Sequence, residues 1–128
     1  MGRNALFSVT VDDVQKTIRI APRGELDGAA VPRFDDVVRA CEQEPASTIM
    51  LDLRDVTFLD TTGLHALLQA RSRARGNGHR LLFVRVSAPV RKVFGVTGME
   101  SVLDEHEAPV SPIDLFTGSE HHPSRPRI

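Results

Sequence analysis

The chain has 128 residues, which is enough for one domain with its own hydrophobic core. Its formal net charge is -1 with 26% charged residues, so the composition gives no reason to expect nucleic-acid binding. The single cysteine, Cys41, excludes an internal disulfide framework, and its apolar helical surroundings are typical of a core residue. No run approaches the roughly 20 apolar residues of a membrane helix. The N-terminus lacks a signal-peptide stretch, so we expect a cytoplasmic protein with no membrane contact.

The first part of the chain predicts a hairpin followed by a helix. Residues 6–11 alternate between apolar and polar side chains and residues 17–20 read Thr-Ile-Arg-Ile, which indicates two antiparallel strands. Residues 24–28, Gly-Glu-Leu-Asp-Gly, are expected to end the second strand in a loop. A helix is expected over about residues 30–43. Its apolar side chains recur at helical spacing: Phe34, Val37, Val38 and Cys41.

The middle of the chain predicts a strand and a long helix. Residues 48–53 form an apolar run of strand character, and a short turn follows it. A helix begins after Asp60 and is closed by residues 76–78, Gly-Asn-Gly. Arg71, Arg73 and Arg75 in its last turns suit the negative end of the helix dipole and are expected to be solvated.

The last part predicts further alternation. Residues 80–86 form a largely apolar strand, which we expect to be central in the sheet. Ser87 can cap a third helix, which Gly95 and Gly98 are expected to break. Two short elements should follow, a strand over residues 101–103 and a helical turn over residues 111–116.

The predicted element order is therefore β-β-α-β-α-β-α-β-α. Alternation of strands and helices implies an α/β fold, a mostly parallel mixed sheet with one antiparallel N-terminal strand. Residues 1–117 are expected to form this single domain. Residues 118–128 offer no apolar face, which predicts a disordered C-terminal tail.

The most informative motif is Asp60-Thr61-Thr62-Gly63, where the long helix begins. Asp60 is a good N-cap, because its carboxylate can accept a hydrogen bond from a backbone N–H of the first turn. Thr61 and Thr62 then lie at the positive end of the helix dipole with hydroxyls near solvent. A phosphate there would find N–H donors and a favourable dipole, but also the adjacent Asp60 carboxylate. These residues alone fit either a switchable hydroxyl or a simple helix cap.

Other kinds of site are not indicated. The histidines are scattered or, as His121 and His122, adjacent in the tail, and no cysteine pair exists, so we expect no metal site. A nucleophile elbow and a phosphate-binding glycine loop are both missing from the sequence, so we expect neither an enzyme nor a cofactor. Asp52, inside a strand, is expected to satisfy backbone groups near the strand end.

The order and spacing of several motifs resemble the STAS domain, specifically the bacterial anti-sigma-factor antagonist family. The resemblance runs from about residue 6 to residue 103. It rests on segments 24–27 (Gly-Glu-Leu-Asp), 51–53 (Leu-Asp-Leu), 58–64 (Phe-Leu-Asp-Thr-Thr-Gly-Leu), 74–78 (Ala-Arg-Gly-Asn-Gly), 87–94 (Ser-Ala-Pro-Val-Arg-Lys-Val-Phe) and 97–99 (Thr-Gly-Met). The usual motif is Asp-Ser-Ser-Gly, whereas this chain has threonine at both hydroxyl positions.

The resemblance implies a partner switch. The unphosphorylated antagonist binds an anti-sigma factor that is also a serine/threonine kinase, and so frees a sigma factor. Phosphorylation switches the binding off, and a phosphatase resets it. The resemblance makes Thr61 the phosphoacceptor, and Asp60 the residue that orients Thr61. Thr62, a second hydroxyl, becomes a competing acceptor. Asp27 becomes the acidic neighbour of Thr61, while Gly63 allows close approach of the partner backbone. The residues expected to bind the partner are Asp27, Asp60, Thr62, Gly63 and His65.

His65 follows Thr61 by one helical turn and should share its exposed face. It could pair with a phosphate, contact the partner, or be an ordinary solvated histidine. We expect a monomer or a weak dimer. The alternative function is a STAS module that senses a small ligand or nucleotide, or that serves as a subunit of a transporter or signalling assembly.

Overall fold

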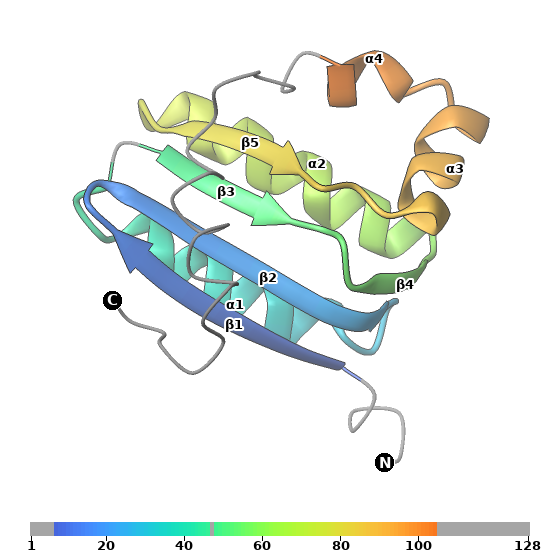
Figure 1. Cartoon of the computed structure of the whole chain (residues 1–128), viewed down its shortest axis with the longest axis horizontal. Coiled ribbons are helices and arrows are strands. Elements are labelled where there is room, and N and C mark those ends of the chain that lie inside the picture. The colour runs from blue at the N-terminus through green and yellow to red at the C-terminus, as the bar shows by residue number, and fades with distance from the viewer. Residues whose placement is uncertain (1–6, 47, 105–128) are drawn as a thin grey trace.

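The structure, a computed structural model, describes residues 7–46 and 48–104. The strands are β1 (Phe7–Val14), β2 (Thr17–Leu26), β3 (Thr48–Asp52), β4 (Val56–Leu59) and β5 (Arg80–Val84). The helices are α1 (Val31–Glu42), α2 (Thr61–Gly76), α3 (Ala88–Val96) and α4 (Glu100–Asp104). The strands form one five-stranded sheet of order β1-β2-β3-β5, with β4 paired to β2 (Figure 1). Only the β1–β2 pair is antiparallel among the described strands. The predicted α/β class with a mixed sheet is confirmed.

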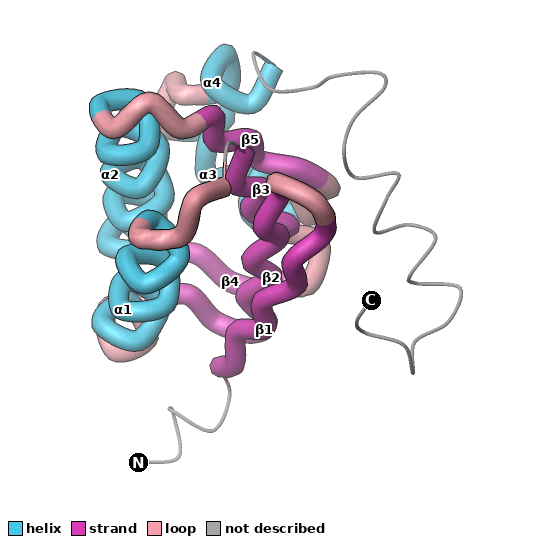
Figure 2. Tube along the Cα trace, turned by 90° about the vertical axis from the view of Figure 1, so that its left-hand side faces the viewer, coloured by secondary structure: helices cyan, strands magenta, loops and turns pink. Residues whose placement is uncertain are grey.

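Helices α1 and α2 lie side by side on one face of the sheet (Figure 2). Alternation along the strands turns Ile49 and Leu51 of β3 toward this face, and both are fully buried. On α1 the predicted apolar stripe is confirmed, because Phe34, Val38 and Cys41 are its buried residues. Burial, followed by the charges of nearby carboxylates, raises the pKa of the Cys41 thiol to about 11. Cys41 is therefore protonated at neutral pH and belongs to the core, as the sequence predicted.

The other face of the sheet holds a second buried cluster and an ion pair. Met50, Leu82 and Val84 form the cluster. Beside it, Arg19 of β2 donates from Nε and Nη2 to Asp52 Oδ2, both at 2.9 Å. The Arg19 Nη1 atom also lies 2.6 Å from Asp12 Oδ2 on β1. The side chain of Asp52 is fully buried, and its Oδ1 accepts from the backbone N–H of Arg54 at 3.3 Å, so the expected structural role near the strand end is confirmed, with Arg19 as a further partner.

The element order differs from the prediction in two places, and reads β-β-α-β-β-α-β-α-α. Residues 56–59, expected to be a turn, form β4, which pairs with the last residues of β2. Strand β2 accordingly continues to Leu26 instead of ending at residue 24. Residues 101–103, expected to be a strand, belong to α4, because a short apolar run has no periodicity that separates strand from helix.

The structure corrects three further expectations, on the position of β5, the cap of α3 and the end of α3. Strand β5 was expected to be central, but it pairs with β3 alone among the described strands and lies at an edge. Its apolar sequence reflects burial on both faces, since Leu82 and Phe83 are each at most 2% exposed. Ser87 is the N-cap residue of α3, but its hydroxyl donates to the backbone oxygen of Val56 at 2.7 Å instead of capping the helix. Gly95 lies inside α3, and Gly98, with φ of 79°, follows its end.

The C-terminal turns of α2 are only partly solvated. Arg73 lies 3.0 Å from Glu42 Oε2 and ties α2 to α1, whereas the sequence suggested a solvated helix end. None of the described helices is long and apolar enough to cross a membrane. The predicted helical turn at 111–116 and the predicted tail at 118–128 lie outside the described residues.

Candidate functional site

Asp60 holds the start of α2. Its backbone is extended, with φ of -104° and ψ of -175°, and its Oδ1 accepts from the backbone N–H of Gly63 at 2.9 Å. Its carbonyl accepts from the N–H of Leu64 at 2.9 Å. The predicted N-cap is confirmed. The carboxylate is thus held by the first turn of the helix, beside the Thr61 and Thr62 positions.

The two threonines face solvent at this helix end. Thr61 and Thr62 are both exposed, and neither hydroxyl has a hydrogen-bond partner within the described part of the chain. His65, one turn further along α2, is exposed as well. An acceptor hydroxyl must be reachable by an incoming phosphoryl donor, and both threonines meet this requirement.

Gly63 fastens α2 to the sheet. It is buried, and a Cβ placed on it would lie 2.2 Å from the carbonyl oxygen of Leu26 and 2.8 Å from Cδ1 of Leu59. The backbone that closely approaches Gly63 in the structure is therefore that of β2 in this same chain. The motif glycine brings the N-terminus of α2 against the ends of β2 and β4.

Asp27 shapes the loop beside the threonines. It is 8% exposed, and its Oδ1 accepts from the backbone N–H groups of Ala29 and Ala30, both at 3.1 Å. The carboxylate thus holds the turn that leads from β2 into α1. The next residue, Gly28, lies close to the motif, because a Cβ placed on it would be 4.0 Å from Thr62 Oγ1. The structure therefore brings the Asp27 loop and the Asp60 motif together.

Sequence reasoning missed two residues at this end of the sheet. Gly28 borders Thr62, and Phe58 of β4 is 48% exposed two residues before Asp60. A phenylalanine at this position could have been noticed as unusual only if β4 and its exposed face had been predicted. Neither Gly28 nor Phe58 belongs to a helical or strand pattern of apolar residues that would have singled it out.

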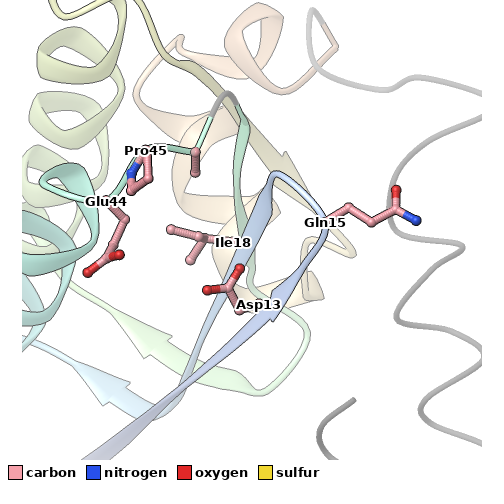
Figure 3. A pocket seen from close by; sticks show the side chains of 6 residues that line it. Asp13, Gln15, Ile18, Glu44 and Pro45 are labelled. Carbon is pink, nitrogen blue, oxygen red and sulfur yellow. The ribbon is translucent and has the colours of Figure 1, made fainter.

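A small pocket lies at the opposite end of the sheet. It is lined by residues of the β1–β2 hairpin and of the connection after α1 (Figure 3): Asp13, Gln15, Ile18, Glu44, Pro45 and Ala46. Ile18 and Ala46 mark the beginnings of β2 and β3, whereas Thr61 follows the carboxyl end of β4. The pocket is thus remote from the threonines. Within the described residues no group of His, Cys, Asp or Glu side chains could hold a metal ion.

The Asp60 cap can be separated from any other role by substitution. Asp60→Ala should lower the free energy of unfolding by about 0.5–2 kcal/mol, because the Gly63 N–H loses its acceptor. Asp60→Ser restores an acceptor and should recover stability more than it recovers phosphorylation or partner binding. Urea unfolding and a phosphorylation assay on the three proteins test this. Equal recovery of every property by serine would mean that Asp60 serves only as a cap.

Comparison with known proteins places this geometry in a family. The family model described as "STAS domain" matches residues 8–112. An anti-sigma-B factor antagonist from Staphylococcus aureus is 27% identical over 104 residues, covering 81% of this chain and 94% of the relative. The unphosphorylated anti-sigma factor antagonist SpoIIAA superposes with a TM-score of 0.66 at 22% identity, covering 89% of this chain and 97% of that one.

A second SpoIIAA structure, of the Bacillus protein in its phosphorylated form, superposes with a TM-score of 0.65 at 21% identity. That match covers 88% of this chain and 99% of the other. At these identities the two solved structures establish the shared fold. The family model spans the sheet, the helices and the Asp60 motif, and on that evidence the chain belongs to the STAS domain family.

Proposed function

We propose that this chain is an anti-sigma-factor antagonist controlled by phosphorylation of Thr61. Its unphosphorylated form binds an anti-sigma factor that is a serine/threonine kinase, and this binding releases a sigma factor. A phosphatase restores the active form. The observation that carries the proposal is the exposed Thr61 hydroxyl, directly after the N-cap Asp60 at the start of α2, in a STAS domain. The similarity to curated anti-sigma-B factor antagonists supports it.

In this proposal the surface that meets the partner surrounds the start of α2. Thr61, Thr62 and His65 contribute exposed side chains. Asp27 and Gly63 act from beneath, Asp27 by holding the loop next to Thr62 and Gly63 by holding α2 on the sheet. Thr62 remains the alternative acceptor, since its hydroxyl is exposed too.

Phosphorylation can break such a complex by charge alone. A phosphothreonine carries a charge of about −2 at neutral pH. At roughly 6 Å from a partner carboxylate and an effective dielectric near 40, this charge costs about 2–3 kcal/mol. That is about a hundredfold in affinity, before any steric effect of the phosphate. The fold of the antagonist does not have to change.

The test of the proposal is Thr61→Ala. This variant should bind the purified anti-sigma-factor kinase of the source organism as wild type does, but should take up no phosphate from ATP. The reason is that the acceptor is deleted while the Asp60–Gly63 cap stays in place. Intact-mass measurement and isothermal titration calorimetry read the two properties. Thr62→Ala is the matched control. Phosphate uptake by Thr61→Ala at the wild-type rate, with none by Thr62→Ala, would reassign the acceptor to Thr62.

The charge argument has its own test. Thr61→Glu adds one negative charge where phosphate adds nearly two, so it should weaken kinase binding by about 1–1.5 kcal/mol, roughly half the phosphate penalty. Calorimetric titration of wild type, Thr61→Glu and phosphorylated protein should therefore give three ordered affinities. Phosphorylated protein that binds as tightly as the unmodified form would refute partner exchange.

A further inference from the structure

Phe58 is unusual among the phenylalanines of this chain. It is 48% exposed, whereas the other phenylalanines in the described residues are between 0% and 7% exposed. An isolated exposed apolar residue needs no special explanation in itself. The position of Phe58 makes it informative, because β4 leads directly into Asp60 and Thr61.

The exposure of Phe58 is built into the strand pairing. In β4, Val56 pairs with Gly24 and Phe58 with Glu25, so β4 carries one extra residue, Thr57, at a bulge. As a result Val56 and Leu59 are both buried while the two residues between them, Thr57 and Phe58, are exposed. Val56 and Leu59 are the residues of β4 that pack in the hydrophobic core. Among the described residues, Phe58 belongs to neither hydrophobic core cluster, so the core that the structure describes does not demand an aromatic ring at this position.

Phe58 also lies within reach of anything that engages Thr61. The two residues are three Cα–Cα steps of 3.8 Å apart, which is at most about 11 Å. A protein interface of standard size covers about 800 Å² on each partner, equivalent to a disc of about 16 Å radius. An interface of that size centred on Thr61 therefore extends beyond the distance to the Cα atom of Phe58.

We propose that Phe58 is the apolar anchor by which this chain docks on the kinase that phosphorylates Thr61; this inference rests on the proposed function. The side chain is a rigid aromatic on a paired strand, and phenylalanine is among the aromatic residues that dominate interface energetics. The kinase is expected to offer it an apolar pocket next to its phosphoryl-transfer site. In this role Phe58 contributes to binding of the kinase and leaves the chemical step to the kinase.

The test uses the full chain and the purified anti-sigma-factor kinase of the source organism. Phe58→Thr should raise the Kd by about 30-fold, which corresponds to the loss of one hot-spot side chain. The KM for phosphorylation should rise by a similar factor while kcat stays within about twofold, because uniform binding energy is removed. Phe58→Tyr keeps the ring and should stay within about threefold of wild type in Kd. Val11→Thr, at a strand position 46% exposed, is the matched control and should change neither constant.

Each outcome decides between the two proposals. A wild-type chain that the kinase neither binds nor phosphorylates overturns the proposed function itself. A wild-type chain that is bound and phosphorylated, with Phe58→Thr bound equally well or Val11→Thr equally weakened, overturns the anchor alone. A loss in kcat at unchanged KM also overturns the anchor, since Phe58 would then act through the position of Thr61. Thermal melting verifies folding, and Phe58→Gln replaces Phe58→Thr if the latter melts below the assay temperature.

Discussion

Gly63→Ala is expected to lower the free energy of unfolding by about 3 kcal/mol, the upper end of the range for overpacked sites. The added Cβ would lie 2.2 Å from the carbonyl oxygen of Leu26, far inside contact distance. Because that atom belongs to the backbone of a paired strand, it cannot turn away as a flexible side chain could. Helix α2 must shift off the sheet instead, and the Asp60 cap with it. Urea unfolding of the variant measures the loss.

Gly76→Ala is the matched control for this prediction. Gly76 is in the same helix, and a Cβ placed on it would meet nothing within 4 Å. The helix propensity of alanine should leave stability unchanged or raise it by up to about 1 kcal/mol. If Gly63→Ala and Gly76→Ala behaved alike, the close approach of α2 to β2 would not constrain position 63.

Arg19→Met is expected to destabilise the protein by about 3–5 kcal/mol, because the fully buried carboxylate of Asp52 loses the guanidinium at 2.9 Å and is left with that of Arg54, whose Nε lies 3.9 Å away. A second substitution that removes the stranded charge, Asp52→Leu in the same chain, should recover most of the loss. Denaturant unfolding of the two single variants and the double variant forms a double-mutant cycle. Arg23→Met, at an exposed position on the same strand, should change stability by no more than about 0.5 kcal/mol. A loss in Arg19→Met no larger than that in Arg23→Met would show that the buried pair contributes nothing.

Local patterns in the sequence predicted the parts of the fold that depend on a few neighbouring residues. The stripe on α1 was visible because its buried residues, such as Phe34 and Val38, recur with the helical period. The N-cap was visible because Asp60 precedes a helical pattern and its acceptor reaches a donor only three residues away. The hairpin could also be predicted from neighbouring residues, since β1 and β2 are joined by a short turn. The exposed threonines follow from the cap, so the candidate acceptor also came from local information.

The remaining features were decided by contacts between residues far apart in the chain. Strand β4 has only four residues and forms because Leu59 finds Leu26 as its neighbour on β2, more than thirty positions earlier. The partner of Asp52 is Arg19, which is 33 residues away. Strand β5 is apolar on both faces yet lies at an edge of the sheet. The sequence could not predict this position, because apolar residues indicate that a strand is buried and not how many strands it pairs with.

The same division runs through the candidate site. The sequence by itself determined the Asp60 cap and the two solvent-facing hydroxyls, because a helix start depends on hydrogen bonds within one turn. Only the tertiary structure decided what lies against that turn, namely the Leu26 carbonyl against Gly63 and Gly28 beside Thr62. It also decided that the side chain of Phe58 is exposed. The physical reason is that these contacts arise from strand pairing and helix docking. Both depend on the packing of the whole sheet, which no short stretch of sequence encodes.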